Sequence, residues 1–136
     1  MSPGGSGDGE SGSDGESGSA VAEFAMVAAL VLALFLGVVQ VAFTQHVRSL
    51  VIDAASEGAR VAARADRDAD DGIARTRALI GASLSRRYAD DVVARTSVRD
   101  GLPVVEITVR APLPVVGLLG PSGTMTVSGH ALEERP

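Results

Sequence analysis

The sequence contains no cysteine and no tryptophan, and all 12 of its basic residues are arginine, so lysine is absent as well. Without cysteine there is no disulfide, no thiolate chemistry and no cysteine-based metal site. Aromatic residues are rare and are not interleaved with clustered arginines, so we predict no nucleic-acid partner. The two histidines, His46 and His130, have no nucleophile motif beside them. The sequence shows neither a cofactor fingerprint nor a metal-ligand constellation. We therefore expect no cofactor, no metal and no catalytic residue, and a protein that is not an enzyme.

Positive charge is missing from the first part of the chain. Residues 1–18 are almost entirely Gly, Ser, Asp and Glu, and they contain no arginine. Beyond residue 18 acids and arginines nearly balance, so the formal net charge of −5 comes mainly from this segment. A segment with so few apolar side chains cannot offset the entropy lost on ordering. We predict a disordered acidic leader over residues 1–18.

The most informative feature that is present is an uncharged apolar run over residues 24–43. At ~1.5 Å of rise per residue, about twenty helical residues cover the ~30 Å hydrocarbon core of a bilayer. Gln40 is the only strongly polar residue of the run. A buried core helix is the alternative, but the other apolar segments are too short to surround a helix that is apolar on all sides. We predict a single transmembrane helix over residues 19–43, with the lipid bilayer as a partner.

The helical pattern continues beyond the apolar run. One stripe of residues 44–65 carries apolar and small side chains at helical spacing, namely Val47, Leu50, Val51, Ala54, Gly58, Val61 and Ala65. On the other side, Glu57 and Arg60 are spaced to pair at i,i+3. One helix over about residues 20–66 would be ~70 Å long. We assign residues 44–71 to an extracytoplasmic extension of this helix and to the break that ends it.

The break is rich in aspartate, with Asp66, Asp68, Asp70 and Asp71. Such a cluster is able to hold calcium, but the spacing and terminal glutamate of an EF-hand are absent. We favour a capping role, in which Asp70 or Asp71 is the N-cap of a second helix over about residues 72–88. The apolar face of that helix would carry Ile73, Ile80, Leu84 and Tyr88.

A β-hairpin is predicted around Asp100-Gly101, a strong two-residue turn signal between valine-rich runs. Its register pairs Val98 with Pro103, Thr96 with Val105, Ala94 with Ile107 and Val92 with Val109 on a mostly apolar face. The opposite, mostly polar face pairs Arg95 with Glu106 and Val93 with Thr108. The turn type and the period of two agree on this register.

A third strand is predicted over about residues 123–132, after an apolar loop over residues 112–122. Met125, Val127, Gly129 and Ala131 would face inward, whereas His130 would be a solvated or edge side chain. Residues 72–136 are few for an independent core, so we expect them to pack on the stripe described above. The predicted fold is an α+β membrane protein: a long N-terminal helix, a second helix and a small antiparallel sheet of about three strands.

A short motif, Gly18-Ser-Ala-Val-Ala-Glu23-Phe24, stands directly before the apolar run. It resembles the processing site of type IV prepilins and pseudopilins, in which a prepilin peptidase cuts after the glycine and a glutamate follows five residues later. An aromatic residue after the glutamate is typical of the tight-adherence (Flp) branch. The later segment from Ile52 to Ala63 resembles TadE-like minor pilins. The resemblance implies processing between Gly18 and Ser19.

The spacing of this motif has a physical reason. Cleavage after Gly18 would create an ammonium group on Ser19, which is an i,i+4 neighbour of Glu23 in a helix. A lone carboxylate near the bilayer centre costs on the order of 3 kcal/mol, and pairing with the amine of the same or another subunit removes much of this cost. The alternative is that Gly18 is merely the last residue of a Gly/Ser-rich segment.

Small residues recur every four positions along the predicted span, at Ala25, Ala29, Ala33 and Gly37, and the same spacing returns at Ala54, Gly58 and Ala62. Ridges of small residues let helix backbones approach closely in lipid, so we predict that these positions pack against other helices. Chance spacing in an alanine-rich sequence is the alternative.

The resemblance implies a TadE-like pseudopilin that is a structural or priming component in tight-adherence pilus assembly or secretion. Its implied partners are the prepilin peptidase, other pilins or pseudopilins, and membrane proteins of pilus assembly. It implies a single-pass protein of the cell membrane, with a cytoplasmic N-terminus and an extracytoplasmic C-terminal domain, either incorporated in a pilus or retained in the membrane. Charge alone favours the reverse orientation, because Arg48 follows the span and no base precedes it. Two alternatives are an unprocessed, signal-anchored extracytoplasmic binding domain and a secreted protein whose apolar run is a signal peptide.

Overall fold

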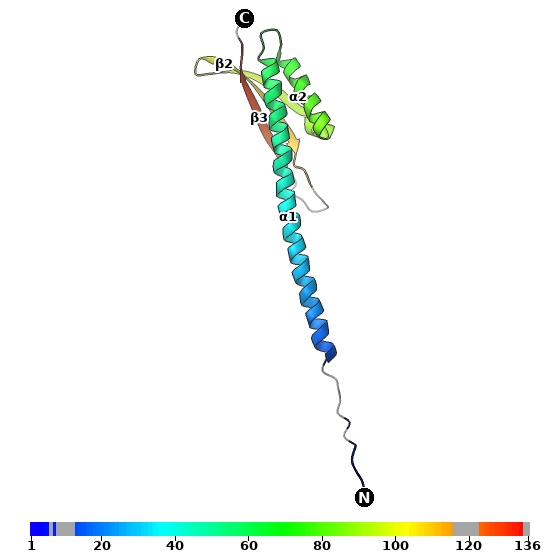
Figure 1. Cartoon of the computed structure of the whole chain (residues 1–136). Coiled ribbons are helices and arrows are strands. Elements are labelled where there is room, and N and C mark those ends of the chain that lie inside the picture. The colour runs from blue at the N-terminus through cyan, green and yellow to red at the C-terminus, as the bar shows by residue number, and fades with distance from the viewer. Residues whose placement is uncertain (6, 8–12, 116–122, 135–136) are drawn as a thin grey trace. The chain divides into compact units, whose positions relative to one another are not determined.

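The computed structural model describes residues 1–5, 7, 13–115 and 123–134. Helix α1 spans Ser13–Ala62 and helix α2 spans Ala69–Ser83, followed by the short 3-10 helix η1, Arg86–Ala89. Three strands complete the described residues: β1 (Asp91–Arg99), β2 (Leu102–Pro112) and β3 (Thr124–Leu132). The predicted fold class, with a long first helix, a second helix and a three-stranded antiparallel sheet, is confirmed (Figure 1).

The chain divides into two compact units, Met1–Val39 and Gln40–Pro136, and α1 contributes to both. In the first unit α1 exposes large apolar side chains, among them Phe24 at 75 % and Leu30 at 70 %. Among the described residues, α1 is the one helix that is long and apolar enough to cross a membrane. Because none of the residues that the structure describes covers these side chains, this part of α1 is suited to act as a membrane anchor.

Helix α1 differs from its predicted limits at both ends. It begins at Ser13, so residues 13–18 of the expected disordered leader are helical. Extending a helix that already exists costs far less than nucleating one, which accounts for these extra turns. At the other end α1 stops at Ala62 instead of near residue 66, and the carbonyl of Ala63 accepts a 2.7 Å hydrogen bond from the Glu134 N–H. The chain that follows β3 therefore satisfies a carbonyl just beyond the end of α1.

In the second unit, the end of α1 and helix α2 contribute to one core with the sheet, whose strand order is β1-β2-β3. The core is built from buried apolar side chains of every element, chiefly Val47, Val51, Ala55, Ala59, Ile80, Tyr88, Val92, Ile107, Val109, Met125 and Val127. Most of the predicted stripe of α1 is buried here, although Ala65 is exposed and lies beyond the end of the helix. The predicted packing of the helix and sheet on α1 is therefore confirmed.

The predicted hairpin register is confirmed at every pair, from Val98 with Pro103 to Val92 with Val109. Asp100 and Gly101 have positive φ angles of 53° and 79°, as a two-residue hairpin turn of this kind requires. Strand β3 adds to the other side of β2, and Met125, Val127 and Gly129 are buried as predicted. Residues 116–122 of the predicted apolar loop lie outside the described residues.

Candidate functional site

The residues of the predicted processing motif all lie on α1. Gly18, Ser19, Glu23 and Phe24 are helical and exposed. No atom outside the helix backbone lies within 4 Å of the position where a Gly18 side chain would start. Ser19 and Glu23 are four residues apart on this helix and therefore share one face. The motif is thus placed on the surface of the chain, at the polar edge of the apolar run.

The small residues predicted to pack against other helices fall into two groups. Ala25, Ala29, Ala33 and Gly37 are exposed along the first part of α1. Ala54, Gly58 and Ala62 are instead buried inside the second unit. Only the first group presents a surface to another chain, whereas the second group contacts elements of its own chain.

The crossing of α1 and α2 depends on two glycines, Gly58 and Gly72. A side chain at Gly72 would lie 2.6 Å from the Ala62 Cβ and 2.7 Å from the Gly58 carbonyl oxygen. A side chain at Gly58 would collide with the Thr76 hydroxyl. That buried hydroxyl donates to the Gly72 carbonyl at 2.9 Å and also lies 3.4 Å from the Ala54 carbonyl. The two backbones are therefore close enough that any larger residue would separate them.

Strand β3 approaches α1 equally closely at Gly129. A Cβ added there would lie 2.5 Å from the Ser56 Cα and closer still to the Ser56 nitrogen and the Ala55 carbonyl carbon. Gly129 was predicted to face inward, but its contact with the backbone of α1 was not predicted. An isolated glycine inside a strand pattern is the signal that indicates such an approach.

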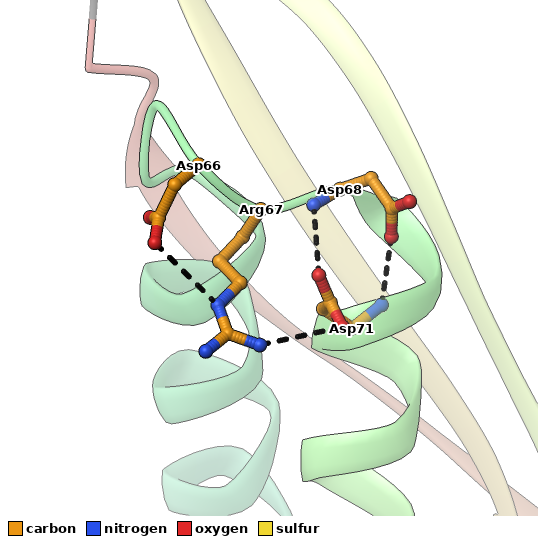
Figure 2. A network of polar contacts seen from close by, with 4 residues as sticks. All are labelled: Asp66, Arg67, Asp68 and Asp71. Atoms are coloured by element: carbon orange, nitrogen blue, oxygen red, sulfur yellow. Dashed lines mark hydrogen bonds and ion pairs between the residues drawn. The ribbon is translucent and has the colours of Figure 1, made fainter.

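The aspartate-rich break forms a helix cap, as predicted, but at a different residue (Figure 2). The N-cap of α2 is Asp68, not Asp70 or Asp71. Its carboxylate accepts from the Asp71 N–H at 3.0 Å, and the Asp71 carboxylate accepts from the Asp68 N–H at 3.2 Å. Reciprocal capping needs acceptors three residues apart, which only this choice provides within the cluster.

Arg67 forms ion pairs with two aspartates of the same break, Asp66 and Asp71. Its guanidinium nitrogens lie 3.7 Å from an Asp71 carboxylate oxygen and 3.9 Å from an Asp66 carboxylate oxygen. Figure 2 shows Arg67 between these two aspartates. These carboxylates are therefore occupied by backbone N–H groups and by an arginine. No group of three or more potential metal ligands occurs among the residues that the structure describes.

The second helix also ends earlier than predicted. Leu84 has an extended backbone, with φ −136° and ψ −178°, so α2 stops at Ser83. The predicted face of residues 72–88 is therefore divided between two elements, with Ile80 in α2 and Tyr88 in η1, and both are buried.

The outer face of the sheet carries a polar cluster around Glu106. His130 Nε2 lies 3.1 Å and the Arg99 guanidinium 3.9 Å from the same carboxylate oxygen, and Thr108 donates to the other at 3.2 Å. Partial burial of the Glu106 carboxyl raises its pKa. Hydrogen bonds from Thr108 and His130, together with the charge of a protonated His130, lower the pKa by more, so the pKa of Glu106 lies below its usual value. His130 was predicted to be solvated or at an edge, and its pairing with Glu106 was missed. Register supplies the signal, since the two residues are directly opposite on β2 and β3.

Comparison with known proteins gives one family. Residues 18–60 match the family of TadE-like proteins. No curated protein and no solved structure matches the chain. The matched region begins at Gly18 and includes the processing motif, the apolar run and most of the α1 segment that packs on the sheet.

Proposed function

We propose that this chain, which is a TadE-like protein of the tight-adherence system over residues 18–60, is a pseudopilin matured between Gly18 and Ser19. The family is one of pilus components, so the protein is associated with a tight-adherence pilus and interacts with other components of that system. The finer role that we propose is that of a structural or priming subunit, not of an enzyme. The observation that carries the proposal is the family match over the processing motif and the exposed apolar helix that follows it.

Access to the scissile bond supports processing by a prepilin peptidase. The helical residues 13–18, before Ser19, are only Ser, Asp, Gly and Glu. Each glycine in a helix lowers helix stability by about 1 kcal/mol relative to alanine. Gly18 itself is exposed, with open space around its Cα. A peptidase that binds extended substrate thus opens this end of α1 at low cost, without disturbing the apolar turns that follow.

The position of Glu23 supports assembly after processing. It stands at the edge of the apolar run, where a lone carboxylate drawn toward the bilayer centre costs on the order of 3 kcal/mol. The new ammonium on Ser19 lies on the same helix face and offsets this cost. When the amine of one subunit pairs with Glu23 of the next, the same interaction sets the register between their helices.

The exposed ridge of Ala25, Ala29, Ala33 and Gly37 supports close packing against other pilins or membrane proteins of pilus assembly. In the proposed topology the N-terminus is cytoplasmic, α1 crosses the membrane over residues 19–43, and residues 44–136 are extracytoplasmic. Processing on the cytoplasmic side requires this orientation, although Arg48 alone favours the opposite one.

Two substitutions with matched controls test the proposal in cells that have an active prepilin peptidase. Gly18→Ala is expected to leave the chain uncut, while Gly15→Ala, at a helical glycine that is equally free of neighbours, is expected to be cut normally. Glu23→Gln is expected to be cut but to reduce surface pili, and Glu16→Gln, which changes only the leader, is expected to leave pili unchanged. If the wild-type chain and Gly18→Ala both keep their full length and Glu23→Gln forms normal pili, an unprocessed, signal-anchored binding domain is favoured instead.

A further inference from the structure

An open hollow of about 520 Å³ lies between α2 and η1, on the surface of the second unit. Its walls are formed by residues of α2, of η1 and of the segment that leads to β1, namely Arg77, Ala78, Gly81, Arg86, Ala89 and Asp90. Binding sites of proteins commonly have volumes of about 300–1,000 Å³. The hollow is therefore large enough to receive a projecting part of another molecule.

The walls of the hollow carry positive charge that the second unit does not neutralise. Among the residues that the structure describes, neither Arg77 nor Arg86 forms an ion pair, whereas Arg99 lies 3.9 Å from a carboxylate oxygen of Glu106. The two arginines and Asp90 leave the walls with a net charge of +1. Guanidinium groups form their strongest hydrogen bonds with carboxylates, and an aspartate accepts hydrogen bonds from N–H groups. The hollow thus suits a carboxylate that is accompanied by N–H donors.

Gly81 leaves one wall of the hollow without a side chain. It lies in the interior of α2, where glycine is less favourable than alanine. No described atom lies within 4 Å of the position of an added Cβ, so packing within the second unit does not account for this glycine. A bare helix backbone allows another chain to approach closely, which gives Gly81 a role that packing does not.

A second surface without a partner is the end of the hairpin formed by β1 and β2. Every residue of the segment 95–102 is exposed, on both faces of the hairpin. Val98 and Leu102 are apolar, yet they are 73 % and 49 % exposed. The ladder stops before the turn, so the N–H groups of Asp100 and Gly101 take no part in it. The turn therefore presents a carboxylate, N–H donors and flanking apolar side chains.

We propose that the hollow between α2 and η1 receives the Asp100-Gly101 turn of a second copy of this chain. The two guanidinium groups of the hollow bind the Asp100 carboxylate, and Asp90 accepts from the N–H groups of the turn. Ala78 and Ala89 of the walls contact the apolar side chains that flank the turn. Charge, hydrogen bonding and apolar surface thus all match, and the bare backbone at Gly81 leaves room for the incoming turn.

The contact has to form between copies because β1 separates the two surfaces within one chain. Strand β1 begins directly after Asp90 and ends directly before Asp100. Its nine residues place the hollow and the turn roughly 30 Å apart. Since the contact joins unlike surfaces, each copy in a row keeps a free turn or a free hollow, and such contacts build open filaments unless they close into a ring. The inference rests on the proposed role as a structural subunit, but not on processing at Gly18.

The absence of cysteine makes a direct test possible, because each introduced thiol is unique. Full-length Ala78→Cys, labelled at the hollow, is mixed in detergent micelles with full-length Leu102→Cys, labelled beside the turn, and treated with a short thiol-specific cross-linker. We expect a covalent dimer from the mixture and little from either variant alone, because the contact joins unlike positions. Ser83→Cys, at an exposed position of α2 outside the hollow, is the matched control and should give little dimer with Leu102→Cys.

Two further substitutions test the charges. Asp100→Asn in the Leu102→Cys chain keeps the turn, because Asn-Gly favours the same turn type, but it removes the carboxylate. Arg86→Gln in the Ala78→Cys chain removes one guanidinium. Each should slow dimer formation roughly tenfold, as the loss of a hydrogen bond between charged groups predicts. Arg75→Gln in the Ala78→Cys chain, at an exposed arginine of α2 outside the hollow, should leave the rate unchanged.

Three results would overturn the inference. Equal dimer formation at positions 78 and 83 would mean that the chains meet by collision alone. An absence of the dimer between positions 78 and 102 would mean that the turn of this chain is not the occupant. An unchanged rate with Asp100→Asn, or an equal loss with Arg75→Gln, would remove the proposed role of the charges. Gly18→Ala in both chains should give the same dimer, so a failure of the proposed processing leaves this result intact.

Discussion

Replacing Gly129 by alanine tests the closest contact between the sheet and α1. The new Cβ would lie 2.5 Å from the Ser56 Cα and even nearer to two other backbone atoms. Backbone cannot rotate away as a side chain does, so helix and strand must move apart along the core. Overpacking costs about 1–3 kcal/mol, and we expect the upper end because the obstacle is backbone. With roughly 4–8 °C of melting temperature per kcal/mol for a domain of this size, a loss of about 3 kcal/mol predicts a fall of roughly 12–24 °C.

Gly81→Ala is the matched control for this prediction. Gly81 lies inside α2 with no atom within 4 Å of the position of a new Cβ, so alanine meets no obstacle there. Its better helix propensity should stabilise the chain by about 0.8–1 kcal/mol. Glycine-to-alanine substitution is therefore predicted to lower the free energy of unfolding at Gly129 and to raise it at Gly81.

Thermal unfolding of the full chain in detergent micelles measures both variants. The chain has no tryptophan, and Tyr88 is its only tyrosine. Because the Tyr88 ring is buried in the core of the second unit, tyrosine fluorescence reports the unfolding of that unit and not of the apolar part of α1. A melting temperature of Gly129→Ala within a few degrees of the wild-type value, or higher than that of Gly81→Ala, would contradict the close contact between β3 and α1.

Three further predictions concern the second unit. Asp68→Ala should cost about 1 kcal/mol in unfolding by denaturant, because it removes the N-cap of α2, whereas Asp70→Ala should cost much less. The pKa of Glu106 is lowered in the folded state, so the carboxylate stabilises the fold above the unfolded pKa, and this stabilisation is lost as pH falls through the folded pKa. The free energy of unfolding of Glu106→Gln should therefore fall less steeply below about pH 4.5 than that of the wild-type chain. Gly101→Ala should cost about 1–2 kcal/mol, since alanine is strained at φ 79°; an unchanged melting temperature would contradict the assigned turn.

Local patterns were sufficient to predict the sheet. The turn residues Asp100 and Gly101 and the alternation of valines each favour the same register, so one signal checks the other. The pairing of Glu57 with Arg60, observed at 3.5 Å, followed from helical spacing in the same way. These features depend on neighbours in sequence or directly across a hairpin, which a single sequence specifies.

Features that depend on tertiary contacts were predicted less well. Ala54, Gly58 and Ala62 have the same spacing as the small residues of the span, but α2 covers them, and spacing alone cannot distinguish a partner in the chain from a partner subunit. The limits of α1 and α2 are set by Glu134 bonding to Ala63 and by Asp68 pairing with Asp71, neither of which periodicity reveals. Gln40 was identified as the only strongly polar residue of the apolar run, but its hydrogen bond to Pro114 joins residues too distant in sequence to be paired without the fold.

The most direct test of the central claim is the mass of the native protein, purified from membranes of cells with an active prepilin peptidase. We predict that the chain begins at Ser19, with residues 1–18 removed, and that the same chain from cells lacking the peptidase retains them. A native chain that still carries its acidic leader in the presence of the peptidase would contradict the assignment of Gly18 and Glu23 as a processing site.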